Sequence, residues 1–258
     1  PDAGSDLAGI RSRAERDEAQ GGWRLHGQKT WASRGAFADW CFGLFRTDPD
    51  AERHRGLTYF LVPLDAPGVA VRPIAQLDGE TGFAEIFFED VFVPDDQVLG
   101  GVGEGWRAAM ATAGSERGLT LRSPARYTEA AARLVDLYAE RLASDPGAAE
   151  RSSEAVAQAW IDAEAYRLHT LWTASHVLEG GSVGPEASAN KIHWSETDLA
   201  IHRTALELLG PAAEAPEDEV SGPWLEGFLF ALAGPIYAGT NEIQRNVVAE
   251  RLLGLPRA

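Results

Sequence analysis

Four short segments of the sequence contain residue types that can bind or transform a small molecule: residues 3–6, 29–35, 115–118 and 234–245. None is a self-contained motif of the phosphate-loop or zinc kind. The first is a turn of small residues around Ser5, whose hydroxyl and neighbouring amides could bind a phosphate. An ordinary turn has the same composition, so this segment indicates a site only together with others.

The second segment places an aromatic ring and a hydroxyl group two residues apart. Trp31 and Ser33 stand near the end of an expected strand, and alternate residues of a strand share one face. A ring beside a hydroxyl donor suits a planar cofactor. A core tryptophan next to a solvated serine is the structural alternative.

The third segment carries an acid at the end of an expected helix. Glu116 continues the apolar stripe of Trp106, Ala109 and Ala113 at three- and four-residue spacing, which predicts that its side chain points inward. A buried carboxylate is costly unless it is paired. It is therefore either half of a structural ion pair or a general base whose pKa is raised by desolvation.

The fourth segment is a glycine-bearing loop that leads into a helix, with Thr240 or Asn241 as the predicted N-cap. The N-terminus of a helix can bind an anion or polarise a carbonyl group. Capping alone also explains these residues.

Composition limits the partners of these segments. The chain has 258 residues and a net charge of −16, so it repels phosphate backbones and anionic lipids, which argues against nucleic-acid and membrane partners. A single cysteine, Cys41, and six scattered histidines give no zinc-binding pattern, so we expect no metal site. No apolar run is long enough to span a membrane. These features predict a cytoplasmic protein.

The elements that position the four segments change type along the chain. Residues 1–98 are predicted to form a β domain, with strands near 23–32, 57–64, 69–71 and 84–93. Residues 99–258 are predicted to form a helical domain, with helices over 105–121, 125–142, 153–178, 186–209, 224–232 and 241–253. Strands followed by helices indicate an α+β fold.

Five stretches in order give the chain its resemblance to the acyl-CoA dehydrogenase family. They are PDAGSDLAGI, GQKTWASRG, FEDVFVPDDQVLG, GWRAAMATAGSERG and IYAGTNEIQRNVVAERLLGLP. The resemblance implies a β-barrel-like middle domain followed by a C-terminal four-helix bundle. It also implies that FAD desaturates an acyl-CoA thioester between its α and β carbons, with an electron-transferring flavoprotein as acceptor. The family's N-terminal helical domain is expected to be absent from this chain.

The resemblance assigns roles to individual residues near the flavin. Ser5 matches a serine near the flavin and its phosphates. Trp31 and Ser33 match a tryptophan and a threonine that pack on the flavin and bind its N5 edge. Thr240 and Glu242 match positions on the last helix that approach the cofactor.

The catalytic base is expected at an alternative position. Many members have a glutamate where this chain has Ala238, but a branch that resembles isovaleryl-CoA and long-chain dehydrogenases supplies it from the position of Glu116. The backbone N–H of Ala238 would still bind the thioester oxygen. Arg117, Tyr237 and Gly239 are the expected substrate contacts.

Two further features keep other functions open. The family's Gln-Ile-Gly-Gly element is reduced to residues 207–211, with Glu207 where a phosphate contact is expected. The chain could therefore be a non-catalytic subunit of a heteromeric dehydrogenase, or an oxidase-type relative. Family sites are completed between subunits, so a homo- or hetero-oligomer is expected, and Trp160, Leu168 and Trp172 either face a partner or belong to the bundle core.

Overall fold

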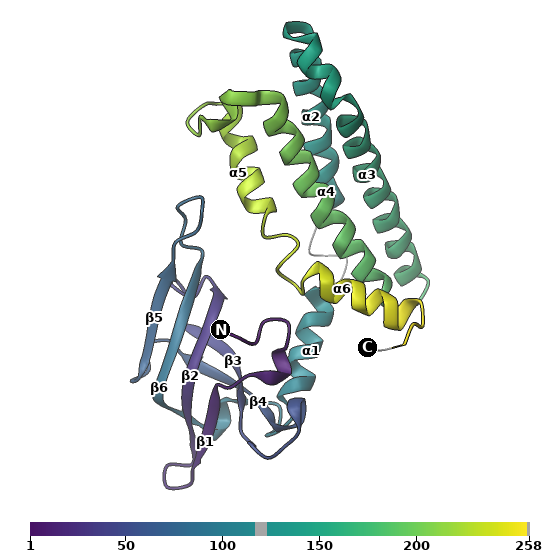
Figure 1. Cartoon of the computed structure of the whole chain (residues 1–258). Helices are drawn as coiled ribbons and strands as arrows, with labels where there is room; N and C mark the ends of the chain where they lie inside the picture. Colours follow the sequence, from purple (N-terminus) through teal and green to yellow (C-terminus); the bar gives the residue numbers. More distant parts are fainter. Residues whose placement is uncertain (117–122, 257–258) are drawn as a thin grey trace. The chain divides into compact units, whose positions relative to one another are not determined.

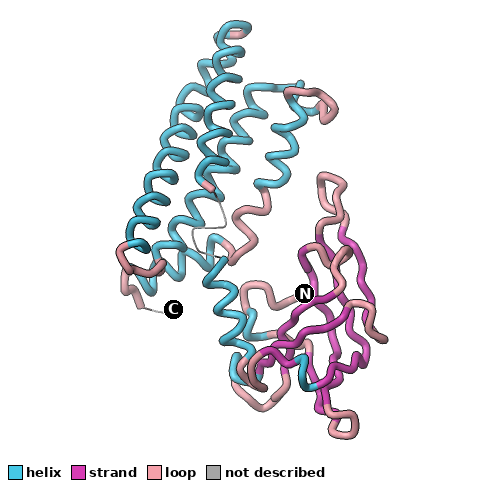
Figure 2. The backbone as a smooth tube through the Cα atoms, turned by 180° about the vertical axis from the view of Figure 1, so that it is seen from behind, coloured by secondary structure: helices cyan, strands magenta, loops and turns pink. Residues whose placement is uncertain are grey.

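The computed structural model describes residues 1–116 and 123–256, without the side chains of 113–116 and 148. The described chain divides by its packing into two units, Pro1–Ser115 and Glu116–Ala258. Strands dominate the first and helices the second (Figure 2). The predicted α+β class, with a sheet domain followed by a helical domain, is confirmed.

The first unit is built on a seven-stranded sheet with the order β5-β6-β2-β1-β3-β4-β7. All neighbouring strands are antiparallel except β1 and β3, which are parallel. The strands are β1 (Arg13–Asp17), β2 (Gly22–Ser33), β3 (Trp40–Arg46), β4 (Leu57–Pro63), β5 (Val69–Ile74), β6 (Phe83–Pro94) and β7 (Val98–Leu99) (Figure 1). Short 3-10 turns lie at Leu7–Gly9, Arg53–Gly56 and Asp95–Gln97.

The sheet curls around an aromatic core. Phe45 on β3 meets Phe88 on β6 edge-on, with ring centroids 5.1 Å apart, although β1 and β2 lie between these strands in the sheet. Trp23 on β2 likewise meets Phe60 on β4 at 5.8 Å. A flat sheet could not bring such distant strands together, so the barrel-like expectation describes this curl.

Helix α1 (Gly105–Glu116) packs with the sheet unit. Ala109 is buried beside Ile10, Leu44 and Leu57, and Trp106 packs against the same cluster. The expected domain boundary after residue 98 follows the change of sequence pattern and stays a prediction. By packing, α1 lies with the sheet unit, because its apolar stripe contacts residues of that unit.

The second unit is a bundle of four helices, followed by two short helical segments. They are α2 (Pro124–Ser144), α3 (Pro146–Leu178), α4 (Glu186–Leu209) and α5 (Ser221–Ala231), followed by α6 (Asn241–Val247) and a π-helical turn (Val248–Leu252). A 3-10 turn, Gly210–Glu214, follows α4. Helix α3 begins at Pro146, earlier than predicted, because Pro146 occupies a position from which a helix can start without an N–H donor.

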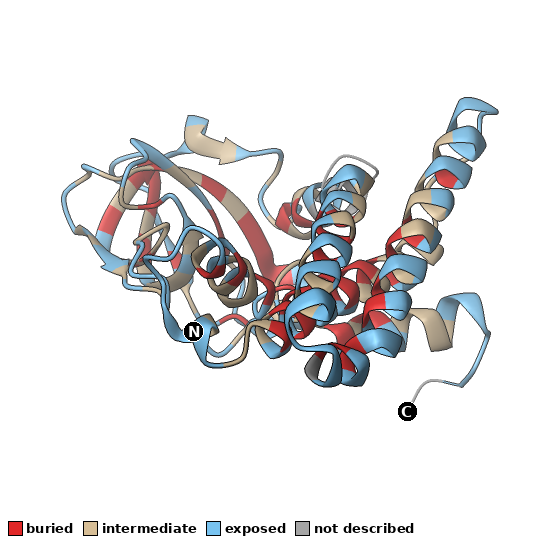
Figure 3. Cartoon of the chain, turned by 90° about the horizontal axis from the view of Figure 1, so that it is seen from above, coloured by how far each residue is buried: buried red, intermediate tan, exposed pale blue. Residues whose placement is uncertain are grey.

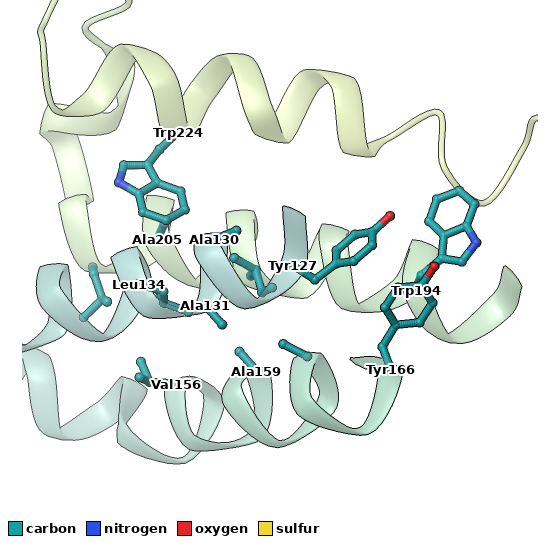
Figure 4. Close-up of a cluster of buried hydrophobic side chains, with 13 residues drawn as sticks. Tyr127, Ala130, Ala131, Leu134, Val156, Ala159, Tyr166, Trp194, Ala205 and Trp224 are labelled. Atoms are coloured by element: carbon teal, nitrogen blue, oxygen red, sulfur yellow. The ribbon is translucent and has the colours of Figure 1, made fainter. Parts of the chain in front are cut away.

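Aromatic rings fill the bundle at its two ends (Figure 4). Tyr127 on α2 lies against Tyr166 on α3 and Trp194 on α4, with centroid distances of 5.0 and 6.3 Å. Trp224 on α5 is buried at the other end and belongs to the same core. Buried residues follow the inner faces of these helices, and exposed ones follow the outer faces (Figure 3).

Candidate functional site

A pocket of about 610 Å³ opens in the sheet unit beside the predicted N-terminal turn. Its walls are residues 1–4, 6–7 and 9–12 of the N-terminal segment and residues 27–31 of β2. Two predicted segments therefore meet in one place. Ser5 is exposed in the same turn but does not line the pocket, and an ion pair of Asp6 with Arg53 at 2.5 Å holds this turn.

Trp31 lies at the rim of this pocket in an unusual backbone conformation. Its φ is 59°, in the left-handed region, and the register between β2 and β6 shifts between Lys29 and Ala32. Such a bulge re-aims a side chain that would otherwise join the sheet's regular alternation. The indole is 61% exposed, so the structural alternative of a core tryptophan is wrong.

Ser33 shares a face with Trp31. Ser33 pairs with Phe83 across β2 and β6, and directly opposite residues of an antiparallel pair project to the same side. The Trp31 ring packs edge-on against Phe83, with centroids 5.8 Å apart. The bulge thus keeps an exposed ring and an exposed hydroxyl at one corner of the sheet.

A lysine that sequence reasoning passed over lines the pocket wall. Lys29 donates a hydrogen bond to the backbone oxygen of Leu44 at 2.5 Å, and its ammonium group lies 4.5 Å from the centre of the Phe45 ring. Burial lowers the pKa of Lys29 to about 8. Strand β1 begins at Arg13, opposite His26, so Lys29 lies beyond its first residue and its side chain reaches from β2 to β3 with no strand between them.

The second unit contains the predicted loop before α6. The Thr240 hydroxyl accepts a hydrogen bond from the N–H of Ile243, which confirms Thr240 as the N-cap. Hydrogen bonds from the N-terminus of α6 and from Thr240 lower the pKa of the exposed Glu242 carboxyl. Tyr237 is half-buried and packs on Trp194, with centroids 5.9 Å apart.

Ala238 and Gly239 give this loop its shape. Their φ values are 54° and 81°, both in the left-handed region. The Gln244 side-chain amide donates to the backbone oxygens of both residues, at 3.0 and 3.4 Å. A Cβ on Gly239 would lie 2.5 Å from that amide nitrogen, so only glycine fits there. In the described part of the chain, the N–H groups of Ala238 and Gly239 donate to no acceptor.

Sequence reasoning missed the buried polar groups that hold this loop. Lys191 on α4 is 4% exposed and donates to the Gly234 backbone oxygen and to Asn241 Oδ1, at 2.8 Å each. Burial lowers the pKa of Lys191 to about 8. The sequence did contain a signal for these residues, because Lys29 and Lys191 are its only lysines. In the structure Lys191 is buried and Lys29 is half-buried.

The predicted base and its neighbour fall at the limit of the described chain. Glu116 is the last residue of α1, and its side chain lies outside the described residues, as does the whole of Arg117. The earlier part of the apolar stripe on α1 points into the protein, as predicted. Trp106 packs with the sheet unit and its ring lies 5.6 Å from that of His54.

Glu207, where the family's phosphate contact is expected, is exposed near the end of α4. Among the described residues, no group of three or more potential metal ligands gathers at one point. None of the helices in the described ranges is both long and apolar enough to cross a membrane.

Family models match most of the chain. The acyl-CoA dehydrogenase middle domain matches residues 1–91, and the acyl-CoA dehydrogenase C-terminal domain matches residues 103–253. The acyl-CoA dehydrogenase IpdE1 of Mycobacterium tuberculosis (strain ATCC 25618 / H37Rv) is 42% identical over the whole chain. This chain spans 65% of that relative's length.

Solved structures agree with the sequence comparison. The structure of the "Tcur3481-Tcur3483 steroid ACAD" superposes with a TM-score of 0.83 at 29% identity, covering 100% of this chain and 67% of the other. The structure of "PigA with FAD and proline" superposes with a TM-score of 0.83 at 25% identity, covering 99% of this chain and 66% of the other. The order of the two matched domains is also the order of the sheet and helical units. This chain belongs to the acyl-CoA dehydrogenase family.

Proposed function

We propose that this chain is the middle and C-terminal portion of an FAD-dependent acyl-CoA dehydrogenase that forms a double bond between the α and β carbons of an acyl-CoA thioester. The observation that carries the proposal is the exposed Trp31 indole, held at positive φ on the rim of a 610 Å³ pocket. Residues held in strained conformations cluster at ligand-binding sites, and the exposed ring beside this pocket supports such a role for Trp31.

The residues present suit FAD. Trp31 offers a flat ring for the flavin, and Ser33 offers a hydroxyl on the same face. The resemblance also assigns cofactor contacts to Ser5 in the sheet unit and to Thr240 and Glu242 at the start of α6 in the helical unit. Bound FAD supplies the acceptor for the hydride that leaves the β carbon.

The chain's own groups handle the proton and the developing charge. Glu116 takes the α proton as general base, and Arg117, Tyr237 and Gly239 contact the substrate. The N–H of Ala238 donates to the thioester oxygen, on which negative charge grows as the α proton leaves. Support comes from the loop, since a donor fixed at positive φ and free of other acceptors in the described chain needs no reorganisation during the reaction.

The proposed substrate is an acyl-CoA with a bulky acyl group, and the proposed electron acceptor is an electron-transferring flavoprotein. One solved relative is called a steroid ACAD, and its name joins two proteins. This likeness supports a steroid-derived acyl group and assembly with a second subunit.

A second candidate function is a non-catalytic subunit of such an assembly. Ala238 favours it, because that position lacks the carboxylate that many family members carry. The exposed Glu207 favours it as well, since an acid repels a cofactor phosphate.

Visible absorption of the purified protein, with and without added FAD, tests the two candidates. We expect a flavin band that a panel of acyl-CoA thioesters bleaches in the wild type. Glu116→Gln should keep the band but prevent bleaching, while Glu129→Gln, which removes an exposed carboxylate on α2, should behave as the wild type. Trp31→Leu should weaken flavin binding about tenfold or more without unfolding the protein, because the indole lies outside the sheet's core.

Absence of any flavin band in excess FAD would contradict the dehydrogenase and favour the non-catalytic subunit. Bleaching in Glu116→Gln at the wild-type rate would remove Glu116 as the base. Flavin reduction that passes rapidly to oxygen, without an electron-transferring flavoprotein, would indicate an oxidase.

A further inference from the structure

One buried side chain, that of Lys191, forms hydrogen bonds at both ends of the loop that contains Ala238. Lys191 Nζ donates to the backbone oxygen of Gly234, where the loop begins, and to Asn241 Oδ1, where α6 begins. Both donor-acceptor distances are 2.8 Å, and the acceptors lie 43 and 50 residues from the lysine in sequence. Helix α4 therefore fixes the distance between the two ends of the loop.

Asn241 is held in turn by groups on α4. Its Oδ1 also accepts a hydrogen bond from Ser195 Oγ at 3.2 Å, and its Nδ2 donates to Glu196 Oε1 at 3.2 Å. The N–H of Asn241 donates to the Pro235 backbone oxygen at 2.9 Å, which closes the loop on itself. The side chain of Asn241 is 2% exposed, so water offers its polar atoms little replacement for these bonds.

Apart from the Trp194 ring, whose centre lies 5.8 Å from its ammonium group, packing gives no reason for a lysine at position 191. Among the described residues, Lys191 forms no ion pair within salt-bridge distance, and its burial lowers its pKa to about 8. A methionine could fill the same space, so the retained property is the pair of hydrogen bonds to the loop.

We propose that Lys191 is a positioning residue, which acts through Gly234 and Asn241 to keep the Ala238 N–H aimed at the thioester oxygen. This inference rests on the proposed function for its chemical consequence. The clamp itself does not depend on that function, because it is a property of the helical unit alone.

Hydrogen–deuterium exchange tests the clamp without requiring activity. The N–H groups of Ile236, Tyr237 and Asn241 donate to backbone oxygens within or next to the loop, so they report its order. In Lys191→Met we expect exchange of these three amides to accelerate about tenfold or more, while exchange in α2 and α3 stays as in the wild type.

Two control variants separate the clamp from general destabilisation. Val156→Ala trims the bundle core on α3, at a side chain that is 5% exposed, and should not accelerate the loop selectively. Lys29→Met removes the other lysine, which is half-buried in the sheet unit, and should leave the loop unchanged. Wild-type protection of the three amides in Lys191→Met would overturn the proposal.

The flavin signal tests whether the clamp serves the reaction. With FAD-loaded protein in single-turnover experiments, Lys191→Met should lower the rate of flavin reduction at saturating acyl-CoA about tenfold to a hundredfold. The dissociation constant of the acyl-CoA should change less than threefold, because a misplaced oxyanion donor affects the transition state more than the ground state. An unchanged reduction rate with a loosened loop would overturn the positioning role.

Failure of the proposed function would give different experimental results from failure of the clamp. If no flavin binds, the dehydrogenase proposal fails and loop exchange still decides whether Lys191 holds the loop. If Glu116→Gln reduces flavin as the wild type does, the base is wrong, and a slowed Lys191→Met still supports the clamp.

Discussion

The two lysines of the sequence stand out among its single residues. Lys191 is buried and Lys29 is half-buried, although lysine side chains are usually exposed. Lys29 bonds the Leu44 backbone oxygen, and Lys191 bonds the Gly234 backbone oxygen. Each joins segments that the regular secondary structure leaves unconnected. Arginine, with a larger and planar head group, fits such single carbonyl contacts less well.

The lowered pKa of Lys29 predicts the sign of a pH effect on stability. The folded protein releases this proton near pH 8, whereas the unfolded chain holds it up to the ordinary pKa of 10.5. The unfolded state therefore binds more protons between these values, and the stability contributed by Lys29 rises with pH across this window. Relative to Lys29→Met, the free energy of unfolding of the wild type should rise by about 2 kcal/mol between pH 7 and pH 10.

Urea unfolding of both proteins at several pH values measures this difference. Comparing the two proteins at each pH cancels the titration of all other groups. A difference that stays constant from pH 7 to pH 10 would show that Lys29 keeps its ordinary pKa in the folded protein.

At the scale of elements, α1 depends on close contact with strand β4. A Cβ on Gly105, the first residue of α1, would lie 2.7 Å from the Thr58 carbonyl carbon and 2.7 Å from Leu44 Cδ1. The N–H of Gly103 donates to Thr58 Oγ1 at 2.9 Å just before the helix. The helix that ends at Glu116 thus begins directly on the strand backbone.

We expect Gly105→Ala to destabilise the protein by about 1–3 kcal/mol, because backbone atoms of β4 cannot move aside as a flexible side chain would. The midpoint and slope of urea unfolding measure this cost. Gly147→Ala is the matched control, since a Cβ there meets nothing closer than 4.0 Å in the first turn of α3, and the change should be neutral or slightly stabilising. Equal stability of both variants would contradict the close contact of α1 with β4.

At the scale of the whole molecule, α3 leaves apolar side chains uncovered. Trp160, Leu168 and Trp172 are 45%, 57% and 56% exposed, so they do not belong to the bundle core. Their spacing along one helix is typical of a second apolar stripe. Apolar surface of this kind usually meets a partner.

We expect the wild type to form oligomers in sedimentation velocity, and Trp172→Glu to shift the distribution toward monomer. A charge in the centre of an apolar interface remains unpaired and desolvated, which costs far more than the lost ring contacts. Leu77→Glu is the control, because Leu77 is 78% exposed in the sheet unit. A wild type that is monomeric at all concentrations, or oligomers unaffected by Trp172→Glu, would contradict self-association through α3.

The order of strands and helices and the family follow from the sequence alone, which also limited the cap of the last helix to Thr240 or Asn241. These features depend on side-chain periodicity, on contacts within one helical turn and on short motifs, all of which are local in the chain. The sequence also brought the N-terminal turn and Trp31 forward as candidates, and they share one pocket. The ligand-binding and catalytic roles of all the assigned residues stay predictions: Ser5, Trp31, Ser33, Glu116, Arg117, Tyr237, Ala238, Gly239, Thr240 and Glu242.

Only the tertiary structure decided how the candidate groups are presented. The bulge that exposes Trp31 is a register shift against β6, which alternation along β2 alone cannot predict. The clamp by Lys191 joins it to residues 43 and 50 positions away. Strand β1 was not predicted because Arg13–Asp17 contains one apolar residue, and β3 was missed although its residues are mostly apolar. Contacts across such separations are set by how elements pack, and local sequence preference carries no information about them.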